Sequence, residues 1–336
     1  MVSFHALARM GIESLVVVSP KTPYVSVGYF QDTARVLDVD RCRALNLPII
    51  RREVGGGCVL LDENQVFYHV ILRKDNPILP RTIDGIYRKF SQPPINTYAH
   101  FGVKVHFKPV NDLVTPEGKK IAGEGGANIG DCMVFVGSII MDFNVKMMAQ
   151  ILRLPDEKFR DKVYKTMENS ISSLKEELGQ TPRREEVEEV LVEEFRKILG
   201  PLEESSLTPE IKSQMQLVEK ELTAENFLFD ERFQRHEAIT IKAGSYIGYG
   251  NYKAKGGLIS TTVTLNDDRI EAASISGDFT LNPKEAITLL ERCLDGVAPC
   301  QEAVHRAFRR VIEANHLSIP GVDAEDLSRA VMDAIG

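Results

Sequence analysis

Three consecutive glycines, Gly55, Gly56 and Gly57, follow the adjacent arginines Arg51 and Arg52, with apolar residues on both sides of the stretch. Glycine has no Cβ, so such a run lets backbone N–H groups approach a ligand closely and reach positive φ angles. Arginine adds a fixed charge and forked donors that suit phosphate or carboxylate. The stretch therefore indicates a main-chain cradle for an anionic ligand, with a simple glycine-rich strand connection as the alternative.

A second set of polar residues lies farther along the chain. Asn111 and Asp112 form an amide–carboxylate pair, and Lys120 opens an apolar segment that leads into a glycine-rich stretch containing Gly123 and Gly125. An amide, a carboxylate and an ammonium group thus lie within ten residues of one another, downstream of the glycine run.

The composition limits the possible functions. The chain has 336 residues, of which 43% are hydrophobic and 26% charged, and its formal net charge of −7 argues against general binding to nucleic acid or an anionic membrane. No apolar run approaches the roughly 18 residues of a membrane span. The N-terminus shows no signal-peptide pattern. The five cysteines form no metal-binding or disulfide pattern, so we expect free thiols in a reducing cytoplasm.

Periodicity predicts the elements that position these residues. Strands are expected at 14–19, 24–28, 66–72, 103–107 and 133–141, with a hairpin through 62–65, and helices at 5–10, 38–45, 82–90 and 146–152. Prolines 93 and 94 must interrupt or restart the helix that follows. Adjacent strand residues face opposite ways. We therefore expect only one residue of each adjacent pair, Lys119 and Lys120 or Arg51 and Arg52, to point into a site.

The second half of the chain is predicted to form a smaller domain. Thr181 and Pro182 have the pattern of an N-cap and first residue of a helix, which should end at Gly200. Strands at 258–265 and 269–276 should pair around 266–268, followed by helices at 283–294, 301–314 and 323–335. We therefore divide the chain into a large domain over 1–200, a connecting region over 201–235 and a small domain over 236–336.

Taken together and in this order, these motifs resemble the lipoate–protein ligase family, which shares its fold with biotin protein ligases. Residues 51–57 with Asp62, then 111–113, then 118–123 match the family's large domain, and residues 252–257 and 275–279 resemble its small C-terminal domain. The resemblance covers most of 14–295. It implies an α/β (α+β), class II synthetase-like large domain, whose mixed sheet is flanked by helices, and a small α+β C-terminal domain.

The resemblance implies a reaction in two steps, with ATP and Mg²⁺ as cofactors and lipoate as substrate. Lipoate attacks the α-phosphate of ATP to give lipoyl-AMP and pyrophosphate, and a lysine of a lipoyl-carrier domain then attacks the mixed anhydride. Charge develops on phosphate and carbonyl oxygens in both steps, so fixed donors matter more than a covalent nucleophile. The enzyme is accordingly expected to be an adenylate-forming ligase that acts in protein lipoylation.

The resemblance also assigns roles to the first motif and to the lysine. The ammonium group of Lys120 would lie between the acyl carbonyl and the phosphate and stabilise both transition states. The three glycines would let the main chain pass close to the acyl chain and the α-phosphate. Arg51 or Arg52, with Arg52 preferred, would bind phosphate.

The remaining site residues are expected at the nucleotide. Asn111 and Asp112 would hold the adenylate or a Mg²⁺ ion on the phosphates, which makes Asp112 the candidate metal ligand; its alternative role is that of a turn cap. Gly123 and Gly125 would belong to a loop over the nucleotide, formed by residues 123–126, that is flexible until the ligand orders it.

Three departures from the family pattern affect ligand detail more than the class of reaction. Val54 stands where the family often has a hydroxyl residue, and Leu61 where it commonly has a histidine. Glu124 stands where members often have a serine, and its charge would oppose phosphate unless the side chain turns away or binds a metal.

Other functions remain as alternatives. An ATP-independent octanoyl or lipoyl transferase of this fold uses a cysteine in the segment corresponding to 108–112, where this chain has none, which leaves Cys132 as the thiol of interest. A non-catalytic binder of lipoyl or biotinyl ligands is suggested by Leu61 and Glu124. Biotin ligation is weaker, because the expected GRGRxGR-like loop is missing from the sequence.

The expected partners are lipoyl-carrier proteins, either a 2-oxoacid dehydrogenase subunit, a glycine-cleavage carrier or a similar protein, and neither nucleic acid nor a membrane. Lipoate and octanoate both remain candidate substrates, because an apolar pocket separates related acyl chains by small energy differences.

Overall fold

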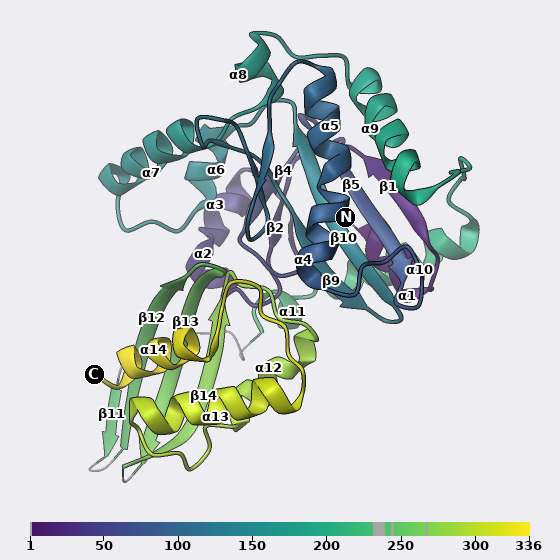
Figure 1. Ribbon diagram of the computed structural model, residues 1–336. Coiled ribbons are helices and arrows are strands. Elements are labelled where there is room, and N and C mark those ends of the chain that lie inside the picture. The colour runs from purple at the N-terminus through teal and green to yellow at the C-terminus, as the bar shows by residue number, and fades with distance from the viewer. Residues whose placement is uncertain (1, 231–238, 243–244, 267) are drawn as a thin grey trace. The chain divides into compact units, whose positions relative to one another are not determined.

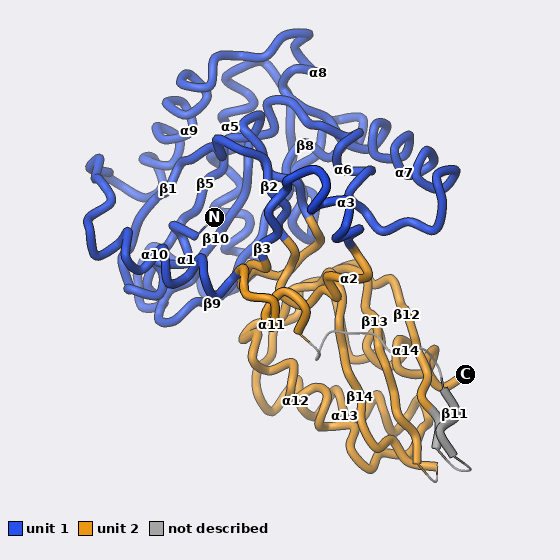
Figure 2. The backbone as a smooth tube through the Cα atoms, turned by 180° about the vertical axis from the view of Figure 1, so that it is seen from behind, with its two compact units in different colours: residues 1–26, 37–50, 59–222 blue, residues 27–36, 51–58, 223–336 orange. Residues whose placement is uncertain are grey.

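The computed structural model of the chain describes residues 2–230, 239–242, 245–266 and 268–336. It forms two compact units, neither of which is continuous in sequence: residues 1–26, 37–50 and 59–222 make the first, and residues 27–36, 51–58 and 223–336 make the second (Figure 2). The predicted division at 200, 235 and 236 assumed domains that are continuous in sequence. Residues 235 and 236 lie outside the described residues, and that division stays a prediction.

The first unit is built on a four-stranded sheet with the order β1-β5-β10-β9 (Figure 1). The strands β1 (Ser14–Val18), β5 (Gln65–Arg73), β10 (Cys132–Ile140) and β9 (Gly125–Ile129) pair antiparallel throughout. The predicted strands at 14–19, 66–72 and 133–141 are therefore confirmed. The two nine-residue strands at the centre, β5 and β10, are almost entirely buried and consist of nearly continuous apolar runs.

Alternation along β5 sends neighbouring residues into different layers. Tyr68 packs near Phe135 and Phe195 in a core that also takes side chains from α4 (Ile83–Phe90), α5 (Gln92–His100) and α9 (Arg184–Leu199). His69 instead lies against Phe4 of α1 (Val2–Arg9), with ring centroids 4.6 Å apart. Tyr68 therefore reaches the layer in which the candidate site described below is anchored.

The prolines at 93 and 94 restart a helix, as expected. Helix α4 ends at Phe90, and α5 begins at Gln92 with a proline at its first turn, where the missing N–H costs no hydrogen bond. Ser91 is both the C-cap of α4 and the N-cap of α5, and it is fully buried. The two prolines thus place a serine hydroxyl at a helix junction inside the core.

The predicted hairpin through 62–65 is wrong. Strand β4 (Val59–Leu61) pairs antiparallel with β2 (Tyr24–Val27), whereas β5 pairs with β1 and β10, so that the two strands belong to different sheets. Strand β3 (Ile49–Arg51) lies on the other side of β2. The N–H of Val25 donates to the carbonyl of Pro48, and the N–H of Arg52 donates to the carbonyl of Val27. Residue numbers thus increase in the same direction along β2 and β3, which is typical of parallel pairing. This three-stranded sheet is the mixed sheet of the predicted fold class.

The start of α9 also differs from the prediction. The helix begins at Arg184 after Arg183, which keeps an extended ψ of 137° and provides no side-chain cap, so Thr181 is not the N-cap. The end before Gly200 is as predicted. The helix contributes three buried apolar side chains to the core: Val187, Leu191 and Phe195.

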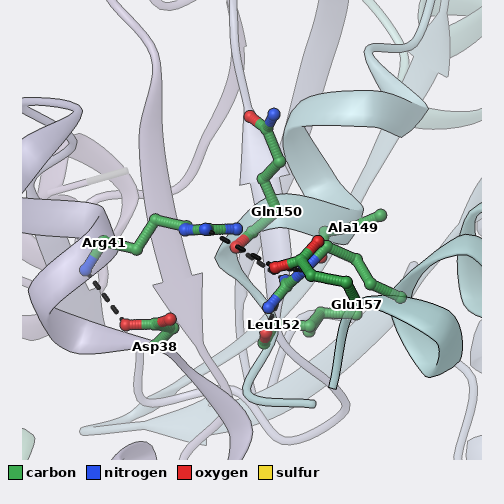
Figure 3. Close-up of polar contacts among 7 residues, drawn as sticks. Asp38, Arg41, Ala149, Gln150, Leu152 and Glu157 are labelled. Carbon is green, nitrogen blue, oxygen red and sulfur yellow. Dashed lines mark hydrogen bonds and ion pairs between the residues drawn. The ribbon is translucent and has the colours of Figure 1, made fainter. Parts of the chain in front are cut away.

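Arg160 fixes the long helix α7 (Glu157–Ser170) against α6 (Val145–Ile151). Its Nη1 donates to three carbonyls at the end of α6, which lack partners within their own helix: Ala149, Gln150 and Leu152. Figure 3 labels these three residues together with Glu157 of α7 and with Asp38 and Arg41 at α3 (Val39–Ala44). Glu157 Oε1 lies 3.3 Å from Arg160 Nε and 3.8 Å from Arg41 Nη2. The backbone N–H of Arg41 donates to Oδ1 of Asp38, the N-cap residue of α3. The segment that follows α7 contacts the strand that carries Lys120, because the N–H of Ser172 donates to the carbonyl of Lys120 (2.8 Å).

The second unit contains an antiparallel sheet with the order β11-β12-β13-β14. Its strands are β11 (Ile239–Lys242), β12 (Ser245–Ala254), β13 (Gly257–Asn266) and β14 (Arg269–Gly277). The predicted strand pair is confirmed as β13 and β14; residue 267 of the predicted turn lies outside the described residues. Helices α12 (Ile287–Arg292), α13 (Gln301–Ala314) and α14 (Ala324–Ile335) follow, the first preceded by a 3₁₀ turn at Lys284–Ala286.

Residues from the early part of the chain complete this second core. Tyr29 and Phe30 belong to the same buried cluster as the apolar residues of β13, α13 and α14. The ring of Phe30 stacks on Phe279, with centroids 5.0 Å apart. The segment 27–36 is therefore part of the core of this unit.

The remaining elements are one helix as long as α7, namely α10, and several short helices and strands. They are α2 (Thr33–Val36), α8 (Leu174–Leu178), α10 (Pro209–Leu222), α11 (Glu225–Leu228), β6 (His106–Lys108), β7 (Asp112–Val114) and β8 (Lys120–Gly123). Strand β6 begins three residues later than the sequence predicted. Among the described residues, no helix combines the length and apolar character needed to cross a bilayer.

Candidate functional site

The small antiparallel sheet β6-β7-β8 brings the predicted lysine and aspartate together. Lys120 opens β8 and Asp112 opens β7, and the distance from Lys120 Nζ to Asp112 Oδ1 is 2.6 Å. The two side chains are 44% and 33% exposed. An ammonium group is thus held in place by a carboxylate and is still accessible to a ligand, which makes this pair the centre of the candidate site.

Gly123 makes room for this pair. A Cβ at Gly123 would lie 3.0 Å from both Cε and Nζ of Lys120, so a larger residue would displace the lysine. Gly123 ends β8 and Gly125 begins β9, with one residue between them. The predicted loop is therefore wrong, because both glycines lie in paired strands. Flexibility before a ligand binds, and contact with a nucleotide, stay predictions.

The two adjacent lysines have different partners, as strand alternation predicts. Lys119 forms an ion pair with Glu176 on α8, whereas Lys120 pairs with Asp112. Only Lys120 thus lies beside the predicted site carboxylate.

Asn111 is connected to the turn after β8. Its Nδ2 donates to the carbonyl of Glu124 (2.8 Å), and the N–H of Glu124 donates to the carbonyl of Asn111 (2.9 Å). These reciprocal bonds extend the β7–β8 pairing by one residue beyond Gly123. Asn111, Asp112, Lys120, Gly123 and Gly125 therefore form one cluster in the first unit.

The carboxyl of Glu124 turns away from this surface into the core. Glu124 is 5% exposed, and its carboxyl oxygens accept hydrogen bonds from the hydroxyls of Tyr68 (2.8 Å) and Ser91 (2.5 Å). Burial raises the pKa of the Glu124 carboxyl from 4.5 to about 8, despite these two hydrogen bonds. The charge conflict expected at this departure from the family pattern is thus avoided by orientation.

We expect Glu124→Gln to change how stability depends on pH. Between about 4.5 and about 8, the carboxyl is ionised when the chain is unfolded and neutral when it is folded. The wild type should therefore lose unfolding free energy as the pH rises through this window, by at most about 1.4 kcal/mol per unit, and Glu124→Gln should not. Urea unfolding at pH 5, 6.5 and 8 measures the difference.

The exposed Glu117, in the turn between β7 and β8, provides the control for this experiment. Glu117→Gln removes a carboxyl from the same hairpin and should follow the wild-type curve. If the unfolding free energies of the wild type and Glu124→Gln depended on pH in the same way, the carboxyl of Glu124 would not be neutral in the folded protein.

Arg51 lies in the second unit, where its guanidinium is fully buried. Its three nitrogens donate to acceptors at 2.7–3.3 Å, five of them carbonyls and one a hydroxyl: Gly28, Tyr29, Gln31, Phe227, Leu228 and Thr33 Oγ1. These contacts give Arg51 a structural role that the sequence did not predict. Whether it also binds phosphate is untested.

Both arginines are buried, and which of them faces a ligand stays a prediction. Strand β3 ends at Arg51, so strict alternation no longer applies to Arg52, which is 8% exposed. The Nη2 of Arg52 donates to the carbonyls of Gly55 (2.7 Å) and Gly57 (2.8 Å). The glycine run thus curves around this guanidinium, and phosphate binding by Arg52 stays a prediction.

The glycines are required by close contacts within the second unit. Gly56 has a φ of +88°, and its N–H donates to the carbonyl of Phe279 (3.2 Å). A Cβ at Gly55 would lie 2.6 Å from that same carbonyl oxygen. These contacts account for two of the three glycines, and ligand binding by the run remains untested.

One buried ion pair was missed by the sequence reasoning. Lys284 Nζ lies 2.6 Å from Glu53 Oε1, and the two side chains are only 11% and 10% exposed. The residues are 231 positions apart, and neither belongs to a motif that would have indicated the contact.

The cysteines offer little support for thiol chemistry. Cys132 is fully buried, and burial raises the pKa of its thiol. Burial also raises the pKa of the Cys42 thiol to about 11 and that of the Cys293 thiol to about 12. A thiol in such surroundings has little of the nucleophilic thiolate form near neutral pH. In the described part of the chain, no three His, Cys, Asp or Glu side chains are grouped to hold a metal.

Comparison with known protein families identifies the catalytic part of the chain. The model of the lipoyl protein ligase A/B catalytic domain matches residues 4–196. Octanoyltransferase LipM of Kyrpidia tusciae is 29% identical over 210 residues, or 56% of this chain and 76% of that protein. The lipoate–protein ligase of Streptococcus pyogenes is 24% identical over 307 residues, or 91% of this chain and 86% of that protein.

Solved structures confirm the fold. The bipartite lipoate protein ligase of Thermoplasma acidophilum, studied with its E2 lipoyl domain, has a TM-score of 0.60 at 22% identity and covers 71% of this chain and 94% of its own. A lipoate-protein ligase A bound with ATP has a TM-score of 0.56 at 18% identity and covers 68% and 92%. The chain therefore has the biotin/lipoate ligase fold.

Proposed function

The chain belongs to the lipoyl protein ligase A/B catalytic domain family, and on that premise we propose that it is an ATP-dependent lipoate–protein ligase. It activates lipoate or octanoate to the acyl adenylate and then transfers the acyl group to a specific lysine of a lipoyl-carrier domain. ATP is the co-substrate, and the ATP-bound ligase of the same fold supports this choice.

The observation that carries the proposal is the accessible Lys120–Asp112 pair. In the first step a lipoate carboxylate oxygen attacks the α-phosphorus and pyrophosphate leaves; in the second, an acceptor amine attacks the acyl carbonyl and AMP leaves. Negative charge develops on phosphate and carbonyl oxygens, and a positioned ammonium stabilises it without forming a covalent bond. Lys120 takes this role, and Asp112 holds its ammonium group in place.

The carboxylate of Asp112 and the amide of Asn111 also fit a Mg²⁺–nucleotide. Mg²⁺ is usually bound by one or two carboxylates together with substrate phosphates, so a site of three protein ligands is not needed. We propose that Asp112 and Asn111 serve the metal and the adenylate, and that Arg52, the glycine run, Gly123 and Gly125 contribute to ligand binding as the family resemblance implies.

An ATP-independent octanoyltransferase is the second candidate, favoured by the similarity to LipM. Two observations favour the ligase. Segment 108–112 holds no cysteine, and Cys132, the alternative thiol, is buried with a raised pKa. In addition, the similarity to the S. pyogenes ligase covers 91% of this chain and so enters residues 223–336.

The acceptor is then a lipoyl-carrier protein, and the T. acidophilum ligase was studied with such a domain. A cytoplasmic setting fits the five cysteines, none of which forms a disulfide. A 2-oxoacid dehydrogenase subunit, a glycine-cleavage carrier or a similar protein would present the required lysine.

Lipoate-dependent exchange of labelled pyrophosphate into ATP tests the proposal. We expect exchange with lipoate or octanoate and none with biotin. Cys132→Ser should leave the exchange rate unchanged, because a buried thiol takes no part in adenylate chemistry. Folded protein with Mg²⁺ that shows no exchange, but moves octanoyl groups between carriers, would establish the transferase instead. A large loss of exchange activity in Cys132→Ser would also favour the transferase.

A further inference from the structure

Glu124 is the single residue between β8 and β9, directly beside the strand that carries Lys120. It is a carboxylic acid in a nearly fully buried position, which is costly unless its polar atoms have partners. The reaction proposed above gives it no role. Its surroundings therefore need a separate explanation.

Three separate elements are arranged around this carboxyl. Tyr68 comes from β5 and donates to one oxygen, and Ser91 comes from the α4–α5 junction and donates to the other. Gly137 on β10 lies opposite Tyr68, and a Cβ there would be 2.3 Å from the tyrosine hydroxyl oxygen. The core thus contains a hydroxyl for each carboxyl oxygen and a glycine that makes room for one of them.

The main chain of Glu124 connects this anchor to the candidate site. Its N–H and carbonyl exchange hydrogen bonds with Asn111, the residue before Asp112. In the β7–β8 register, Asp112 lies opposite Gly123, next to Glu124. The position of β7 relative to Lys120 on β8 therefore depends on the conformation that Glu124 holds.

We propose that Glu124 is a positioning residue of the candidate site: its anchored carboxyl fixes the turn that binds Asn111, and so holds Asp112 at Lys120. This inference rests on the proposed function, because it assigns Glu124 to the same ATP-dependent reaction. Glu124 contacts no reacting atom in this account and acts through Asn111 and Asp112.

Three substitutions separate positioning from simple stabilisation. Glu124→Ala removes the anchor and leaves two buried hydroxyls without their partner. Glu124→Gln keeps a side chain of the same shape, whose amide can pair with hydroxyls that both donate and accept. Tyr68→Phe removes one of the two anchoring hydrogen bonds and retains the ring. Glu117→Ala, in the exposed turn of the same hairpin, is the matched control.

Pyrophosphate exchange is measured at a temperature where thermal unfolding shows every variant to be folded. In Glu124→Ala the KM for ATP should rise about tenfold, and kcat/KM should fall by about 10- to 100-fold, because misplaced site groups lose transition-state and nucleotide contacts. The KM for lipoate should stay within about threefold of the wild type. Glu124→Gln and Glu117→Ala should stay close to the wild type, and Tyr68→Phe should lie between Glu124→Ala and Glu124→Gln.

The contrary results are distinct. If Glu124 had a merely structural role, Glu124→Ala would lower the fraction of active protein, so that kcat would fall while both KM values stayed constant. That outcome would overturn the positioning role. So would a Glu124→Gln variant that is as impaired as Glu124→Ala. Wild-type protein without any exchange would instead refute the ligase function. The two failures are therefore distinguishable in one experiment.

Discussion

Lys120→Ala should abolish the lipoate-dependent exchange of pyrophosphate into ATP, with a loss of about 10²- to 10³-fold or more. The lysine supplies the fixed positive charge beside Asp112, and nothing else in this cluster of the first unit replaces it. The variant should fold normally, because a half-exposed ion pair contributes little to stability. Circular dichroism and thermal unfolding check the fold, and isotope exchange checks the activity.

Lys119→Ala is the matched control for this prediction. It removes the same charge from the neighbouring position, where the lysine pairs with Glu176 instead of Asp112. We expect it to retain nearly full activity. Near wild-type exchange in Lys120→Ala would overturn the site assignment, whereas equal losses in both variants would indicate a general effect of charge.

Arg51→Ala should destabilise the second unit severely. The substitution leaves five carbonyls and the Thr33 hydroxyl without their buried donor. Breaking one buried charged network typically costs about 3–5 kcal/mol, a large part of the 5–15 kcal/mol of a whole domain. Arg51→Lys should also be destabilised, because one ammonium group has neither the reach nor the number of donors of a guanidinium. Urea unfolding measures both variants.

Arg52→Ala provides the comparison, since this arginine is also buried and donates to two glycine carbonyls. We expect a smaller loss of stability than in Arg51→Ala. An Arg51→Ala protein with wild-type unfolding free energy but no exchange activity would instead return Arg51 to the phosphate-binding role that the family resemblance implies.

Local patterns predicted most of the helices and strands. Helix α13 spans the predicted 301–314, because its apolar residues recur on one face with the helical period. The failures have non-local causes. The segment 59–73 has the appearance of a hairpin, yet its two strands find partners in different sheets, and this choice depends on β1, β2 and β10. Periodicity carries no information about such long-range pairing.

The candidate site was predictable only where a motif carried it. Lys120 and Asp112 could be named in advance because their residue types and order match a family pattern, and the structure brings them to 2.6 Å. Tyr68, Ser91 and Lys284 could not, since each is an ordinary residue whose role depends on a group far away in sequence. Glu124 gave one signal: its acidic side chain departs from the pattern.

The discontinuous second unit has a consequence for the order of folding during synthesis. Residues 27–36 and 51–58 leave the ribosome early, but Arg51 meets Phe227 only after 176 further residues, and Glu53 meets Lys284 after 231. Contacts across such long loops form late and slowly. The Arg51 guanidinium can meet its acceptors in residues 28–33 early, but Phe227, Leu228 and the Phe279 ring that stacks on Phe30 are made only later. The nascent chain thus exposes the ring of Phe30 to chaperones for most of translation.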